Sequence, residues 1–279
     1  MSSRAGRVFE RKIRTFVKDL NYLPFDLMDS FTRRRDKFAQ PRRLVFVGDG
    51  DFRKIGEGFF RYFVDLGGLN PNHKVLDVGC GIGRMAVPLT KYLTTGSYYG
   101  FDIVKRGISW TNRVIGAQYP NFHFELADVF NSWYNPAGKY SANEYKFPYP
   151  DNTFDFIYAT SVFTHMLQPE MENYLSEIMR ILKPGGRSLI TYLLVNSESQ
   201  KLNADGLSTL KFEKRNSGDI FRTISKETPE AAVGYDQEYI MRLYESLKLS
   251  ILSPVRYGSW CGRKEYLSYQ DIIISEKAS

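Results

Sequence analysis

VLDVGCGIGR, from Val75 to Arg84, decides the fold of this chain. Its first four residues are typical of a buried strand, three alternating glycines follow, and the next apolar run, MAVPLTKYL, predicts a helix. A strand, a glycine turn and a helix start form a cradle for a nucleotide-like ligand, because glycine lets the backbone turn tightly and lets a ligand approach it closely. Any α/β protein can use such a turn, so the stretch indicates a fold more strongly than a ligand.

The spacing of the glycines narrows the choice of ligand. The dinucleotide fingerprint G-x-G-x-x-G/A requires a glycine or alanine at the position where this chain has Arg84. Arg84 at this position disfavours NAD and FAD as ligands. It favours a nucleoside ligand without a pyrophosphate, of which S-adenosylmethionine is the obvious example. An α/β enzyme that binds NAD or FAD remains an alternative.

Two later strands end in an aspartate. Asp102 closes the apolar stretch YYGFDIV, 19 residues after Gly83, where an acid holds the ribose hydroxyls of a nucleotide. Asp128 follows the alternating stretch FHFEL and can accept a hydrogen bond from an exocyclic amine such as that of adenine. The alternatives are an ordinary surface acid for Asp102 and a helix N-cap for Asp128.

The rest of the chain predicts further strands and helices. The turn signal PDN precedes a strand at 154–158, and ILKPGGRSLITYLL predicts a helix ending at Lys183, a Pro-Gly-Gly turn and a buried strand. Near the C-terminus we expect a helix over 235–247, and strands over 250–257 and 268–275 that pair antiparallel.

The order of these features resembles the class I S-adenosylmethionine-dependent methyltransferases. VLDVGCGIG matches the first motif of that family, Asp102 its ribose acid and Asp128 its adenine motif, and FPYPDNTFDFIYA and LKPGG match its later strands. The resemblance covers roughly residues 59–194 and resumes near the C-terminus. It implies an α/β, Rossmann-like fold with a seven-stranded, mostly parallel sheet, a last strand that is antiparallel, and helices on both faces.

The resemblance also assigns residues to S-adenosylmethionine. It places the methionine part against the glycine turn, the ribose and adenine at the ends of the second and third strands, and the transferred methyl near the end of the fourth. The residues concerned are Asp77, which would support the amino group, Gly79, Cys80, Gly81, Gly83, Asp102, Ile103, Asp128, Val129, Thr160 and Ser161. Cys80 is interpreted as a small residue of the turn and not as a nucleophile.

His165 is the candidate catalytic residue. An oxygen acceptor needs a base, and this histidine follows the fourth strand, with an ordinary pKa that suits proton transfer. The alternative is a histidine that caps the next helix or binds the backbone. A non-catalytic or differently specific nucleotide-binding protein of the same fold is the competing function, although damage to the first motif would be its usual mark and this motif is intact.

The amino-acid composition limits the classes of protein to which this chain can belong. The chain has 279 residues, of which 43% are hydrophobic, only two cysteines with no C-x-x-C motif, and three scattered histidines. These counts predict a reducing compartment, the cytoplasm, and no metal site. No run reaches 18 apolar residues and no secretory signal opens the chain, so we expect neither a transmembrane helix nor secretion.

The positive charge is concentrated at the N-terminus. Residues 1–43 hold 12 Lys or Arg against 5 Asp or Glu, a net charge of +7, and the remainder holds 26 of each sign. Apolar residues from Phe9 to Leu20 are spaced for one helix face, and a second basic cluster at 33–37 follows an apolar segment over 23–31. This extension either packs on the domain, lies on an anionic membrane, or contacts an acidic partner. Nucleic acid is disfavoured, because the neutral remainder offers it no basic surface.

We predict a basic helical extension over 1–52, with a lid or a linker turn at Phe46 to Phe52, followed by the methyltransferase domain over 53–279. Two insertions, at 131–146 and 195–234, are long for their positions, and the first is rich in tyrosine and tryptophan. The second contains a hairpin over 210–225, turning at 216–218. These insertions favour a small-molecule, sugar or lipid-like acceptor.

A loop near the C-terminus allows two interpretations. Trp260, Cys261 and Arg263 lie between the two last predicted strands, in GSWCGRKEYL. They either reach the acceptor or form a packed loop.

Overall fold

The computed structural model describes residues 20–29, 31–32, 37–38, 40–46, 50–132, 134–212 and 220–278. From Arg42 onward, the helices of the described residues are η1 Arg42–Leu44, α2 Phe52–Asp65, α3 Ala86–Leu89, α4 Lys105–Thr111, η2 Asn112–Gly116, η3 Phe163–His165, α5 Gln168–Ile181, α6 Ser197–Ala204, η4 Pro229–Ala231 and α7 Gln237–Ser246. The strands are β1 Lys74–Val78, β2 Ser97–Asp102, β3 Phe122–Leu126, β4 Phe154–Ala159, β5 Leu182–Tyr192, β6 Leu194–Val195, β7 Phe221–Thr223, β8 Val233–Asp236, β9 Leu249–Ile251 and β10 Asp271–Lys277.

Seven strands form the main sheet, in the order β3-β2-β1-β4-β5-β10-β9. The pairs β2–β3, β1–β4 and β4–β5 are parallel, whereas β10 runs antiparallel to both β5 and β9. The predicted fold class is therefore confirmed: the sheet has seven mostly parallel strands, and the strand nearest the C-terminus is the antiparallel one.

The chain forms two compact units. We call them the cradle unit and the distal unit, because the glycine turn lies in the first. The cradle unit comprises residues 1–65, 70–73 and 79–141. The distal unit comprises residues 66–69, 74–78 and 142–279.

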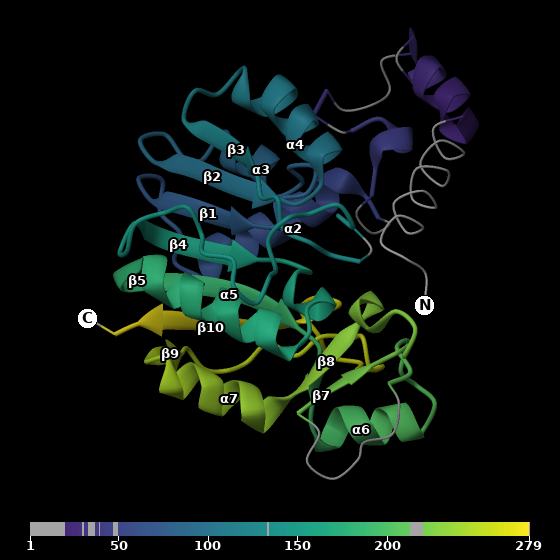
Figure 1. The fold of residues 1–279 in the computed structure, drawn as a ribbon, viewed down its shortest axis with the longest axis vertical. Coiled ribbons are helices and arrows are strands. Elements are labelled where there is room, and N and C mark those ends of the chain that lie inside the picture. The colour runs from purple at the N-terminus through teal and green to yellow at the C-terminus, as the bar shows by residue number, and fades with distance from the viewer. Residues whose placement is uncertain are drawn as a thin grey trace. The chain divides into compact units, whose positions relative to one another are not determined.

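The cradle unit contains β2, β3, α2, α3 and α4 (Figure 1). Tyr98 of β2 is fully buried and stacks on Phe122 of β3, with ring centroids 4.9 Å apart. The helix predicted from MAVPLTKYL is shorter than expected: α3 is only four residues long. The hydroxyl of Thr90 donates to the carbonyl of Val87 at 2.7 Å, a side-chain bond that competes with the helical pattern.

The distal unit contains the other main-sheet strands and a second, three-stranded sheet in the order β6-β8-β7. In Figure 1, α5 and α7 lie in front of the strands of this unit. The apolar side of α5 is buried, from Met171 to Ile181, and α7 begins at an N-cap, Asp236, whose carboxylate accepts the N–H of Tyr239. The helix predicted over 235–247 is thus present, and it begins two residues later and ends one residue earlier than expected.

Three predicted details of the distal unit need correction. The KPGG segment does not turn the chain between helix and strand: α5 ends at Ile181, β5 begins at Leu182, and the segment bulges within β5, where Gly185 takes a positive φ. The strand expected over 250–257 is reduced to β9. The hairpin turn at 216–218 lies outside the described residues, and β7 pairs with β8 rather than with residues near 210.

The N-terminal extension is described only from residue 20. The helix predicted from Phe9 onward therefore lies outside the described residues, except for Leu20. Residues 20–29 and 31–32 are helical, and they include most of the apolar segment that was expected over 23–31. Within the described residues, no helix combines the length and the apolar character needed to cross a lipid bilayer.

Candidate active site

The glycine turn of the cradle unit is held by backbone hydrogen bonds. The N–H groups of Gly79 and Cys80 both donate to the carbonyl of Phe101, at 2.9 and 3.0 Å, and the N–H of Gly83 donates to the carbonyl of Cys80. Gly79, Gly81 and Gly83 all have positive φ, a conformation that side-chain-bearing residues rarely adopt. The sequence uses glycine here because the turn requires it.

Asp102, at the end of β2, binds this turn directly. One carboxylate oxygen accepts the N–H of Gly81 at 2.8 Å, and the other accepts the N–H of Val104 at 2.7 Å. Burial raises the pKa of Asp102 to about 6, although hydrogen bonds from Val104, Gly81 and Ile103 oppose the rise. A carboxylate has about four acceptor positions, so the three backbone bonds leave one position for a hydroxyl of a ribose.

Gly107 is a residue of this region that sequence reasoning missed. A Cβ built on it would lie 2.5 Å from the carbonyl oxygen of Gly81 and 2.9 Å from the ring of Phe46. The first turn of α4 therefore packs closely against both the glycine turn and the segment before α2. A glycine inside the first turn of a helix was the available signal, because it often marks close packing.

Phe46 is the first residue of the segment predicted as a lid. Its ring packs on Gly107 and lies under the guanidinium of Arg106, 5.4 Å from the ring centroid. Residues 47–49 lie outside the described part of the chain. Whether this segment closes over a ligand stays a prediction.

The insertion after β3 folds back on itself. The carbonyl of Asp128 accepts the N–H groups of Lys139 and Tyr140, and the side chain of Asn135 donates to the carbonyl of Val129 at 2.9 Å. Tyr134, within this loop, has a raised pKa, because of burial first and then the negative charge of Asp102. The aromatic insertion thus brings a phenol close to the predicted ribose acid.

The predicted adenine residues lie at the base of this loop. The carboxylate of Asp128 is 39% exposed and lies 3.7 Å from the ammonium of Lys139, and no helix follows it among residues 129–132. The helix N-cap alternative is therefore wrong. Val129 is buried and forms an isolated bridge with Tyr140, whereas Ile103 is half-buried beside Asp102.

The remaining predicted cofactor residues belong to the distal unit. Asp77 is 2% exposed and pairs in register with Tyr158 of β4. Thr160 and Ser161 follow the end of β4. Ser161 has a φ of 57°, and its N–H donates to the hydroxyl of Thr191 at 2.8 Å. A positive φ at a residue other than glycine costs about 1–2 kcal/mol and is often found at functional positions.

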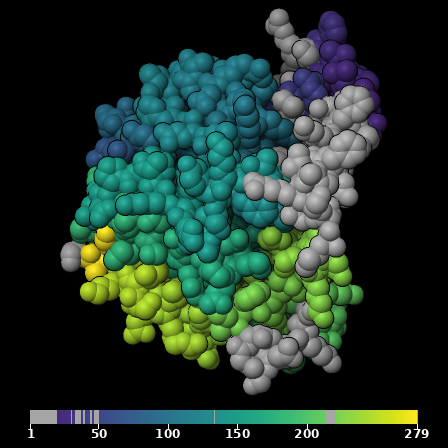
Figure 2. All heavy atoms as spheres, in the orientation of Figure 1, coloured from purple at the N-terminus to yellow at the C-terminus, as the bar shows by residue number. Residues whose placement is uncertain are grey.

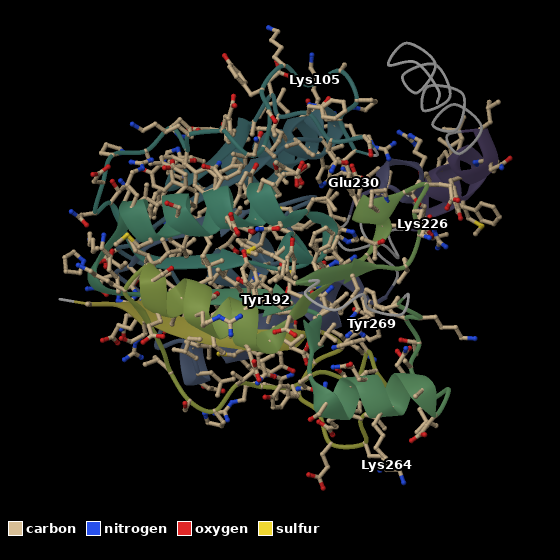
Figure 3. The ribbon with its side chains drawn as sticks, turned by 60° about the horizontal axis from the view of Figure 1, so that its bottom comes forward. Lys105, Tyr192, Lys226, Glu230, Lys264 and Tyr269 are labelled. Carbon is tan, nitrogen blue, oxygen red and sulfur yellow. The ribbon has the colours of Figure 1, made fainter. Side chains whose placement is uncertain are left out.

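His165 lies in η3, four residues after Ser161. Its Nδ1 is 2.9 Å from the carbonyl oxygen of Glu230, a residue labelled in Figure 3. A carbonyl can only accept, so in the neutral ring Nδ1 carries the proton and Nε2 presents a lone pair. Burial lowers the pKa of His165, which keeps the ring neutral near pH 7. The backbone bond that was the alternative interpretation of His165 is therefore present, and its role as a base stays a prediction.

Buried tyrosines support the turn that carries His165. The hydroxyl of Tyr235 donates to the carbonyl of Met166 at 2.8 Å, and Tyr239 donates to Glu172. The hydroxyls of Tyr192 and Tyr244 lie 3.0 Å apart, and Figure 3 shows Tyr192 beside α7. Burial raises the pKa of Tyr192 and of Tyr244, so both stay neutral and structural.

The loop containing Trp260, Cys261 and Arg263 is packed. All three residues are at most 7% exposed, the indole N–H of Trp260 donates to Asp271 at 2.7 Å, and Arg263 contacts Asp271 and Glu198. The packed-loop interpretation therefore fits better than contact with an acceptor.

The predicted residues fall into two groups. Hydrogen bonds join the glycine turn to Asp102 in the cradle unit, while Ser161 and His165 share the turn after β4 in the distal unit. The partners that orient them, Thr191 and Glu230, are distant in sequence and gave no signal of their own.

Comparison with known proteins agrees with this geometry. Residues 50–223, more than half of the chain, match the Methyltransf_23 family model, described as a methyltransferase domain. The chain is 33% identical over 122 residues to a sterol 24-C-methyltransferase of Gibberella zeae, covering 43% of this chain and 27% of that one. It is 28% identical over 167 residues to phthiotriol/phenolphthiotriol dimycocerosates methyltransferase 1 of Mycobacterium ulcerans, covering 59% and 55%.

The chain spans only about a quarter to a half of the length of these curated relatives. Among solved structures, magnesium protoporphyrin IX methyltransferase from Synechocystis PCC 6803, with bound SAH, has a TM-score of 0.51 at 14% identity, covering 94% of this chain and all of that one. That likeness shows the fold. The family match, on the cradle just described, shows that the chain belongs to the class I S-adenosylmethionine-dependent methyltransferases, whose methyl donor is S-adenosylmethionine.

Proposed function

We propose that this chain transfers the methyl group of S-adenosylmethionine to an oxygen atom of a small-molecule or lipid-like acceptor. The observation that carries the proposal is the carboxylate of Asp102, bound to the N–H of Gly81 at the glycine turn. This arrangement fits a nucleoside: the turn offers backbone without side chains, and the carboxylate retains an acceptor position for a ribose hydroxyl.

In the cradle unit, Asp102 and Ile103 would bind the ribose, and Asp128 and Val129 the adenine. Gly79, Cys80, Gly81 and Gly83 would lie against the methionine part. For the distal unit, we assign Asp77 to the amino group and Thr160 and Ser161 to the surroundings of the methyl.

S-adenosylmethionine supplies an activated methyl group, so the protein need only place the acceptor in line with it and remove a proton. His165 would perform the second task. Its Nδ1–H bond to the carbonyl of Glu230 fixes the ring, and Nε2 would take the proton from an acceptor hydroxyl. The bound S-adenosylmethionine would supply the methyl group to the acceptor oxygen, with its bond to sulfur broken.

Two observations support the class of acceptor. The relatives named above are, by their names, a sterol methyltransferase and a phthiotriol dimycocerosates methyltransferase. The insertion at 131–146 also presents aromatic surface, since the side chain of Tyr140 is 58% exposed. Aromatic surface suits an apolar or uncharged acceptor better than a charged one.

The first test is calorimetric titration of the purified chain with S-adenosylmethionine, with NAD as the control ligand. We expect binding of S-adenosylmethionine only, lost in Asp102→Ala and weakened in Asp128→Ala. Transfer of a labelled methyl group into a panel of sterols, long-chain alcohols and amines would then identify the acceptor. Binding without transfer to any acceptor would favour a non-catalytic binding protein, and absence of binding would refute the proposal.

A further inference from the structure

The helical residues 20–29 and 31–32 have their polar and apolar sides reversed. Among them, the buried residues are two acids, Asp26 and Asp29, which are 4% and 9% exposed. Their large apolar side chains are exposed: Leu20 56%, Tyr22 40%, Leu23 41%, Phe25 50%, Leu27 52%, Met28 55% and Phe31 88%. A surface helix normally buries its apolar side, so this arrangement requires an explanation.

The buried acids attach the helix to η1. Asp26 accepts the backbone N–H groups of Arg42 and Arg43, at 2.6 and 3.3 Å, and the guanidinium of Arg43 at 3.2 Å. Asp29 accepts the guanidinium of Arg42 at 3.1 Å. Ion pairs and hydrogen bonds, and not apolar packing, therefore fix which side of the helix faces outward.

The outward side carries a continuous apolar stripe. Leu20, Leu23, Leu27 and Phe31 are spaced by three, four and four residues, which places them on one face of an α-helix. Figure 2 shows this helix, in dark purple, at the molecular surface. The stripe carries no carboxylate, because both acids of the described helix are directed toward η1.

We infer that this stripe docks on the surface of an anionic lipid membrane. Residues 1–43 carry a net charge of +7, which equals the formal excess of the whole chain. An exposed apolar stripe within a strongly basic segment is the combination that binds anionic bilayers, since the apolar side chains enter the interface and the basic ones attract the lipid headgroups. Docking of the stripe on a membrane does not depend on whether the acceptor of the methyl group is apolar.

A second copy of the chain suits the stripe less well. Pairing two identical stripes would bring two segments of net charge +7 together, and like charges oppose such contact. An anionic lipid surface instead complements the charge of the segment.

The test is co-sedimentation of the full chain with vesicles of equal parts phosphatidylglycerol and phosphatidylcholine, compared with vesicles of phosphatidylcholine alone. The variant Leu23→Gln/Leu27→Gln removes apolar surface without adding charge, and glutamine keeps a good helix propensity. The matched control, Leu207→Gln/Tyr266→Gln, alters side chains of the distal unit that are 57% and 60% exposed. We expect wild type and control to bind the anionic vesicles, and the helix variant to bind at least tenfold more weakly.

Binding of S-adenosylmethionine by all three proteins, measured by calorimetry, separates a docking defect from a folding or cofactor defect. Equal vesicle binding by wild type and helix variant would overturn the inference. A second outcome would also overturn it: the wild type forms a dimer without lipid and does not bind vesicles, while the helix variant is a monomer. The stripe would then bind a second copy of the chain.

Discussion

The carboxylate of Asp102 accepts the backbone N–H of Gly81 at 2.8 Å, so the end of β2 and the middle of the glycine turn form one hydrogen-bonded structure. Burial of this carboxylate raises its pKa to about 6. A proton on Asp102 would remove the charge that favours both these backbone donors and the hydroxyls of a ribose. The state of one buried acid should therefore control binding of the cofactor.

Affinity for S-adenosylmethionine should fall as the pH drops through 6. Hydroxyl donors favour the ionised carboxylate, so binding competes with protonation, and the dissociation constant should rise about tenfold for each pH unit below the pKa. Calorimetry from pH 5 to 8 measures this dependence. Asp102→Asn should bind weakly at every pH, and Asp128→Asn should keep the wild-type profile. An unchanged affinity at pH 5 would argue that Asp102 does not contact the cofactor.

Gly107→Ala should disturb the glycine turn from the neighbouring helix α4. The new methyl would lie 2.5 Å from the carbonyl oxygen of Gly81, so α4 must shift, and overpacking of this kind costs about 1–3 kcal/mol. We expect a lower melting temperature and weaker binding of S-adenosylmethionine, by thermal unfolding and calorimetry. Gly116→Ala is the matched control, since its nearest neighbour is 3.4 Å away. Equal behaviour of the two variants would show that the contact with Gly81 is unimportant.

Local patterns predicted most of the fold. The glycine turn of Val75 to Arg84, the acid that ends β2 and the turn before β4 each depend on residues within a few positions of one another, and the structure contains all three. The KPGG segment was predicted as a turn but forms a bulge in β5, because glycine and proline occur in bulges as readily as in turns.

The sequence could not predict contacts between distant residues. The carbonyl of Glu230 binds His165 from 65 positions away, and the hydroxyl of Thr191 binds Ser161 from 30 positions away. The helical residues 20–29 and 31–32 illustrate the same limit. The sequence indicated an apolar segment over 23–31 but not that Asp26 and Asp29 would be the buried residues, which depends on Arg42 and Arg43.

Arg263→Met should destabilise the distal unit. The guanidinium of Arg263 is 4% exposed and contacts Asp271, which is fully buried, so its removal leaves this carboxylate without its cationic partner and costs up to about 3–5 kcal/mol. Urea unfolding measures the loss. Arg242→Met is the control, because its pair with Glu238 is exposed and 3.9 Å long, and such pairs contribute less than about 0.5 kcal/mol. Similar losses in both variants would contradict a special role for the buried pair.

His165→Asn should separate the chemistry of this residue from its structural role. The asparagine amide can still donate to the carbonyl of Glu230, whereas it cannot accept a proton as the imidazole does. We expect kcat for an oxygen acceptor to fall by about 10²–10⁴, with the melting temperature and the affinity for S-adenosylmethionine little changed.

The pH dependence of catalysis gives an independent measure of the same role. Burial lowers the pKa of His165 below its ordinary value of 6.5, so the neutral base should persist to a lower pH than for an exposed histidine. The acidic limb of kcat/KM should accordingly lie below pH 6.5, and it should disappear in His165→Asn. His123→Asn, at an exposed position of β3, should leave both rate and profile intact. Full activity in His165→Asn would mean that the imidazole only holds the backbone of η4, and that another group accepts the proton.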